Sequence, residues 1–120
     1  NMSWEPYLPV TVYKYLTSEC KQVTFKHNFD DERKNKYRKL KTSPYANDEV
    51  NRLVNACFSN TSIGKDAVPD FLSLAYYAGN YDHKAPAELP MEMQDSYVRL
   101  DNSIAEVLEL IVRKAGMIIT

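Results

Sequence analysis

The last third of the chain carries the most regular pattern of hydrophobic positions. Between residues 90 and 115, apolar side chains recur at intervals of three and four, which places them on one face of a helix. Pro90 suits a first helical turn, and Gly116 suits the residue after a helix end. The pattern therefore predicts a helix over 90–115, roughly 38 Å long at 1.5 Å per residue. Its apolar face consists of Tyr97, Leu100, Ile104, Val107, Leu108, Ile111 and Val112.

Two further helices are predicted in the middle of the chain. The first has Asn47 as its cap and ends near Ser59, because apolar residues between them follow helical spacing. The second begins at Asp66 as its cap and ends at Gly79. A helix that is apolar nearly all round is either central to the core or lends one side to a partner. That description fits the second helix, with Val68, Phe71, Leu72, Leu74, Ala75, Tyr76 and Tyr77.

The first third of the chain gives less regular signals. Residues 10–16 fit a strand or a helical face that extends to Cys20, and we favour the helix. Residues 30–41 have the caps of a helix but few apolar side chains, so this helix is expected to be the most solvated. Between residues 23 and 29 every second side chain is apolar or aromatic, and this strict alternation predicts a short extended segment. Ile118 and Ile119 are candidate pairing partners for it. The alternating residues are Val23, Phe25, His27 and Phe29.

These elements predict an all-α fold, a compact bundle of four or five helices with a long carboxyl-terminal helix. The alternative is an α+β fold with a short strand near residues 23–29. A chain of 120 residues, with 44% hydrophobic and 26% charged residues, has the usual size and composition of one domain. We therefore expect a single domain over residues 1–120.

Charge and tyrosine content direct attention to binding. Residues 1–60 carry ten basic and seven acidic side chains, and residues 61–120 carry five and nine, so the two halves have opposite net charge. The nine tyrosines are more than an average chain of this length holds, and tyrosine is enriched where proteins meet. An aromatic contact surface for a partner is predicted from Trp4, Tyr7, Tyr76, Tyr77 and Tyr81.

A basic segment over residues 33–41 is a second candidate contact region, for nucleic acid or an acidic partner. Lysine and arginine neutralise phosphates, and an aromatic ring can stack on a base. On a helix, however, the charges point to several sides, and acidic residues precede them, as expected of any solvated helix. The residues concerned are Arg33, Lys34, Lys36, Tyr37, Arg38, Lys39 and Lys41.

Patterns that support catalysis are sparse. Asp70 followed by Asp82 and Lys84 formally matches nucleases that hold a divalent metal, but Asp70 is expected at a helix start rather than on a strand. His27 and His83 lack further ligands at metal-binding spacing. Three glycines leave no phosphate-binding loop. We therefore expect no catalytic residues, no metal and no cofactor, with a metal-dependent nuclease as a remote alternative.

The sequence thus predicts a small, non-enzymatic protein-interaction module, such as a regulator, an inhibitor or an immunity-type partner, with another protein or a second copy of itself as the partner. The alternative is an accessory protein that binds nucleic acid. No signal peptide or membrane-spanning run is evident, so a cytoplasmic location is expected. An exported protein with a Cys20–Cys57 disulfide is the alternative.

Overall fold

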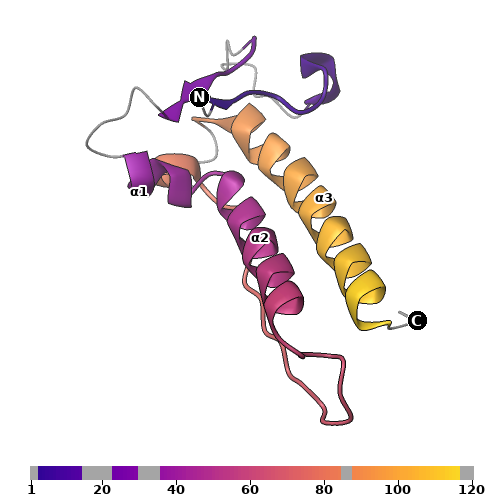
Figure 1. The fold of residues 1–120 in the computed structure, drawn as a ribbon. Helices are drawn as coiled ribbons and strands as arrows, with labels where there is room; N and C mark the ends of the chain where they lie inside the picture. The colour runs from indigo at the N-terminus through magenta and orange to yellow at the C-terminus, as the bar shows by residue number, and fades with distance from the viewer. Residues whose placement is uncertain (1–2, 15–22, 30–35, 85–87, 117–120) are drawn as a thin grey trace.

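The computed structural model describes residues 3–14, 23–29, 36–84 and 88–116. Their elements are mostly helical, in the order β1 (Ser3–Trp4), η1 (Val10–Val12), β2 (His27–Asn28), α1 (Lys36–Lys41), α2 (Tyr45–Asn60), η3 (Tyr81–His83) and α3 (Pro90–Ala115), where η marks a 3-10 helix. The described part contains three α-helices and a two-stranded sheet, so a bundle of four or five helices is not confirmed (Figure 1).

The helix predicted over 90–115 is confirmed as α3. Pro90 occupies the first turn, Glu92 lies near the positive amino end, and Arg113 and Lys114 lie near the carboxyl end. Gly116 follows in a left-handed conformation with φ 67°, which an amino acid without a Cβ adopts at little cost. Proline, the charged residues and glycine therefore allowed both ends of this helix to be predicted from the sequence.

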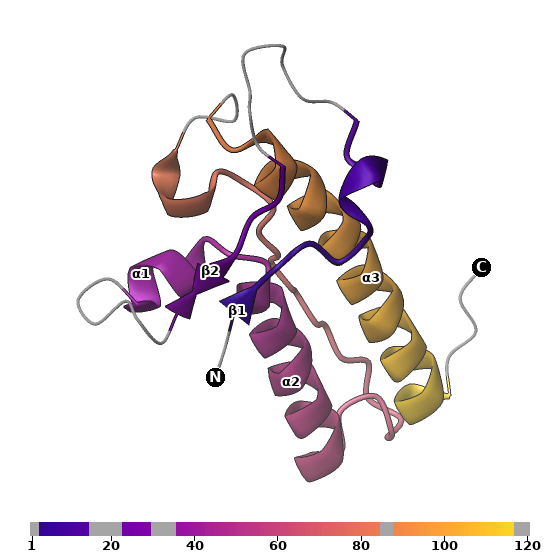
Figure 2. The ribbon, with the colours of Figure 1, turned by 90° about the horizontal axis from the view of Figure 1, so that it is seen from above.

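The predicted helix after Asn47 is also present, but α2 begins earlier. Pro44 precedes its first turn, so Asn47 lies inside the helix, where its side chain is buried rather than capping. The two long helices run in the same direction side by side, and the chain between them returns alongside α2 (Figures 1 and 2).

That returning segment overturns the third predicted helix. Residues 69–78 are extended and contain no helical turn, although the sequence predicts a helix from Asp66 to Gly79. An apolar run without a polar face fits a strand buried on both faces as well as a helix, so periodicity alone did not separate the two. Buried contacts to α2 and α3 determine the outcome.

The amino-terminal prediction is corrected as well. Residues 10–14 form only the three-residue η1 and no α-helix, while residues 15–22, with Cys20, lie outside the described part. The extended segment near residues 23–29 is present as β2, which pairs antiparallel with β1 through Trp4 opposite His27. Ile118 and Ile119 lie outside the described part, and the strand partner that the structure provides is Ser3–Trp4.

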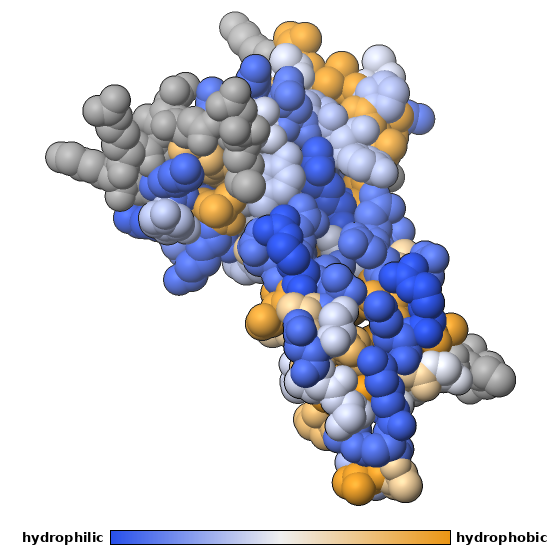
Figure 3. Space-filling view, viewed as in Figure 1, coloured by the Kyte–Doolittle hydropathy of each residue, from blue (hydrophilic) through white to orange (hydrophobic). Residues whose placement is uncertain are grey.

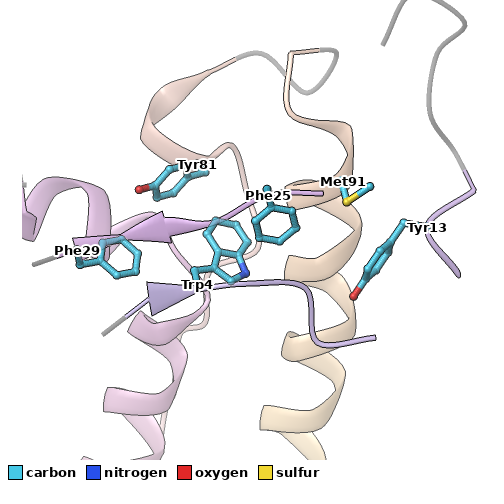
Figure 4. Packing of buried hydrophobic residues seen from close by; sticks show 6 residues of the cluster. All are labelled: Trp4, Tyr13, Phe25, Phe29, Tyr81 and Met91. Carbon is cyan, nitrogen blue, oxygen red and sulfur yellow. The ribbon is translucent and has the colours of Figure 1, made fainter. Parts of the chain in front are cut away.

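Two hydrophobic clusters hold these elements together. The first lies at the upper end in Figure 1 and consists of Trp4, Tyr13, Phe25, Phe29, Tyr81 and Met91 (Figure 4). The second lies between α2 and α3 and consists of Val54, Phe58, Val107 and Leu110, with Leu74 and Tyr76 packed against it. The two clusters attach the amino-terminal segments and the returning segment to opposite ends of the same helix pair.

Candidate functional site

The carboxylate of Asp95 on α3 is fully buried and holds several polar partners. It accepts hydrogen bonds from the Trp4 indole N–H at 2.5 Å, the Tyr13 hydroxyl at 2.5 Å and the Tyr7 backbone N–H at 2.8 Å. Arg99, one turn later, adds an ion pair at 2.8 Å and donates a second hydrogen bond to the Glu5 carbonyl. Asp95 therefore fastens the amino-terminal segment to α3.

Aromatic rings surround this attachment. The Trp4 ring contacts Phe25 and Tyr81 edge to face, each with centroids 5.1 Å apart. Figure 4 shows the Trp4 nitrogen and the Tyr13 oxygen turned toward α3. Because both polar atoms reach Asp95 while the rings stay in apolar surroundings, each aromatic residue satisfies its hydrogen-bonding group inside the core. This arrangement stabilises the fold.

The hydroxyl of Tyr13 makes this attachment sensitive to alkaline pH. Burial, reinforced by the hydrogen bond to Asp95, raises the pKa of Tyr13 to about 12, above its usual value near 10. The unfolded chain then loses this proton at lower pH than the folded chain. Stability from Tyr13 is complete below about pH 10 and declines as pH rises toward 12. In urea titrations from pH 9 to 11.5, Tyr13→Phe should flatten this decline, and an unchanged slope would contradict the assignment.

A shallow cavity of about 390 Å³ opens beside η3 and β2. His27 lies at its wall, with its ring tilted by 48° to that of Tyr81 at a centroid distance of 4.5 Å and hydrogen-bonded to the buried Glu92 at 3.0 Å. Asp82 and His83 both have positive φ, 50° and 58°, a conformation that is costly for residues other than glycine and that gathers at functional sites. The cavity has charged walls of both signs, lined by His27, Lys39, Tyr81, Asp82, Lys84, Glu88 and Leu89.

A second feature lies on the other part of the molecule, where the extended residues 70–78 follow α2. The buried Asn47 side chain clamps this segment, because its amide donates to the Tyr77 carbonyl and accepts from the Tyr77 N–H, both at 2.8 Å. Asn51 accepts from the Tyr76 hydroxyl at 2.5 Å and donates to the Ser103 carbonyl on α3. Two asparagines of α2 thus hold the segment in place.

The loop before this segment and its first residues present apolar side chains to solvent. Phe71 is 91% exposed and Val68 is 67% exposed, while Leu72 borders an apolar groove of about 260 Å³ with Phe58 and Ile111. Figure 3 shows hydrophobic atoms on the surface at the end of the molecule where the loop after α2 lies. We call Val68, Phe71 and Leu72 the apolar tip. Such a cluster is typical of a surface that contacts other protein.

The five aromatic residues predicted to form a contact surface have different environments. Trp4 is fully buried and Tyr81 nearly so, so neither side chain is available at the surface. Tyr76 and Tyr77 are half-buried and hold the returning segment. Tyr7 is 56% exposed, with the Arg99 guanidinium 5.2 Å from its ring centre. The structure therefore does not place the five on one exposed face.

The basic segment is described only from Lys36 onward, and Arg33 and Lys34 lie outside the described residues. Lys36 and Lys39 are half-buried, whereas Arg38, Lys41 and the 80% exposed Tyr37 lie at the surface of α1. Nucleic-acid contact through this helix stays a prediction.

The residues considered for catalysis are not brought together. Asp70 accepts a hydrogen bond from the Gly64 backbone, while Asp82 and Lys84 line the separate cavity beside η3. Among the described residues, no three histidine, cysteine or acidic side chains are grouped as metal ligands would be. Cys57 is a half-buried free thiol. No described helix is long and apolar enough to pass through a membrane.

A charged groove of about 620 Å³ separates the opposite faces of α2 and α3. Both carboxylates and guanidinium groups line it, so neither sign of charge dominates. Burial, followed by repulsion from Glu106, raises the pKa of Asp48 above its ordinary value. The lining residues include Asp48, Arg52, Glu106, Glu109 and Arg113. This mixture fits solvated surface charges better than a site for one charged ligand.

Comparison with known proteins gives a partial match. No family model matches the sequence, and no solved structure matches it. Over 77 residues, 64% of this chain, the sequence is 25% identical to "Alkaline phosphatase PafA" of Elizabethkingia meningoseptica. The matched part is 14% of that protein, so this chain spans only a small part of the length of its curated relative.

Proposed function

We propose that this chain acts by binding further polypeptide, and that it contributes a docking surface rather than a reaction centre of its own. The observation that supports this proposal is the 91% exposure of Phe71 at the start of an extended, apolar segment. Burying a phenylalanine side chain contributes roughly 1.5–3 kcal/mol, so an apolar tip left in water favours association. Of the five aromatic residues predicted to contact a partner, this proposal keeps Tyr7 and the half-buried Tyr76 and Tyr77.

Site-directed crosslinking tests this function. With p-benzoylphenylalanine in place of Phe71 in the source cell, irradiation should join this position to peptides from outside the 120 residues. The matched control is the same replacement at Leu53, which is 72% exposed on α2. We expect at least a fivefold higher yield at position 71, measured by mass spectrometry of the joined peptides. Equal yields at the two positions would contradict a docking role for the apolar tip.

A second candidate function follows from the match to the alkaline phosphatase and from the cavity beside η3. Lys39, Lys84 and His27 line this cavity near two residues of left-handed conformation. In this proposal the chain is the part of a phosphatase-like protein that contributes cationic side chains to a phosphate-binding surface. Titration with inorganic phosphate, followed by the NMR signals of His27, tests it, and Lys84→Ala should abolish the response.

A further inference from the structure

The backbone of residues 70–78 has open hydrogen-bonding groups. Asn47 satisfies both backbone groups of Tyr77. Within the part of the chain that the structure describes, no backbone-to-backbone hydrogen bond joins residues 70–78 to any other segment. A row of unpaired N–H and C=O groups on extended backbone is a template for another strand. The groups left open therefore match the chemistry of a β-strand more closely than that of any other ligand.

The side chains of this segment also match a strand inside a sheet. Leu74 and Tyr76 face the cluster between α2 and α3, whereas Phe71, Ser73 and Ala75 on the alternate positions are exposed. A strand that is apolar on both faces is typical of parallel sheets, which are covered by helices on both sides. Here helices cover one face only, so the second face lacks its cover in the described structure.

Chain connectivity supports the same interpretation. Residues 70–78 run opposite to α2, pass through the loop at η3, and continue into α3, which packs back beside them (Figures 1 and 2). A strand followed by a helix that returns along it is the connection used to join parallel neighbouring strands. The described residues supply the extended segment and the helix but no parallel neighbour.

The dimensions of the molecule agree with an incomplete sheet. Its radius of gyration is 17.2 Å, compared with about 14 Å for a compact domain of this length. If further strands normally cover the segment, their absence explains both the exposed apolar surface and the large radius of gyration. The alkaline phosphatase that the chain resembles over 77 residues is several times longer than this chain.

We propose that residues 70–78 form an inner strand of a β-sheet whose neighbouring strands belong to the same, longer polypeptide. This inference rests on the proposed function, because it names the partner of the docking surface: parallel, apolar strands that pair through their backbone. Phe71, in the apolar tip, then lies at the start of the strand, under helices that cover the second face of the sheet.

Two measurements on the natural protein test this inference. An immunoblot of denatured source cells, with an antibody against residues 49–60, should detect a product several times heavier than 13.9 kDa. Amide exchange of residues 71–76 in that product should be at least about a hundredfold slower than in the 120-residue chain alone. In the long product, Ser73→Pro should prevent folding because proline removes a ladder N–H, whereas Ser73→Ala should be tolerated.

Each other outcome overturns a defined part of the inference. A product of only 13.9 kDa would refute the longer polypeptide. Slow exchange in the 120-residue chain that disappears on dilution would show pairing with a second copy instead. If position 71 crosslinks to outside peptides but residues 71–76 exchange equally fast in both proteins, the docking function stands and strand pairing is refuted.

Discussion

Replacing Asp95 with alanine is expected to release the amino-terminal segment from α3. The substitution leaves the Arg99 guanidinium, the Trp4 indole N–H and the Tyr13 hydroxyl without their shared acceptor in a buried site. Breaking a buried, hydrogen-bonded charge pair from one side costs about 3–5 kcal/mol. Since small domains have a total stability of roughly 5–15 kcal/mol, the loss should lower the urea midpoint markedly.

Trp4 makes this change directly visible, because it is the one tryptophan of the chain. In Asp95→Ala its fluorescence should shift to longer wavelength under native conditions, as the ring becomes exposed to water. Asp101→Ala is the matched control, since Asp101 is an exposed carboxylate on the same helix. Identical urea midpoints and emission maxima for the two variants would show that Asp95 does not fasten the segment.

The second large effect is expected for Asn47→Ala. The buried amide is the contact that satisfies both backbone groups of Tyr77, so its removal leaves a donor and an acceptor without partners. Each unsatisfied buried group costs about 1–3 kcal/mol, and the sum should detach residues 70–78 from α2. Limited proteolysis should then cut within this segment at least tenfold faster than in the unchanged protein.

Asn55→Ala serves as the control for this variant, because Asn55 is an exposed residue of the same helix and has a similar helix propensity. Its rate of cleavage should match that of the unchanged protein. Should Asn47→Ala be cleaved no faster than Asn55→Ala, the clamp would not be what holds the segment.

Particular elements show how far the sequence alone leads. The bounds of α3 were predicted correctly, because proline, glycine and charged residues mark its ends and an apolar face repeats between them. The extended character of residues 23–29 was also recognised, though their partner is Ser3–Trp4. Helix-end residues and hydrophobic periodicity act over a few neighbouring residues, so they can be recognised in a single sequence.

Residues 70–78, which were wrongly predicted to be helical, show the limit of such local signals. In residues 70–78 the alternation of inward Leu74 and Tyr76 with outward Ser73 and Ala75 is hidden, because almost every position is apolar or small. The sequence therefore satisfied a helical period and a strand period equally. The decision came from Asn47, thirty residues away, whose role as a backbone clamp has no signature in its own neighbourhood.

The candidate sites were only partly foreseeable for a related reason. Tyrosine enrichment drew attention to Tyr76, Tyr77 and Tyr81, but did not distinguish buried rings from exposed ones. Asp95 gave no sign beyond suiting the amino end of a helix, since its partners are up to 91 residues away. The exposed Phe71 belonged to a predicted helix and became notable only when that helix proved to be extended.

The buried face of α3 combines Met91 with the polar Glu92, Asp95 and Ser96 in its first half, whereas Val107 and Leu110 make it mainly apolar in its second half. These halves tolerate sequence divergence differently. Aliphatic residues of similar volume can replace one another along the second half with modest loss. In the first half, a change at Asp95 requires matching changes in distant segments, since its donors come from the amino-terminal residues. Relatives of this protein should therefore exchange aliphatic residues readily in the second half of the helix. In the first half they should either retain both Asp95 and its hydrogen-bond donors or lose them together.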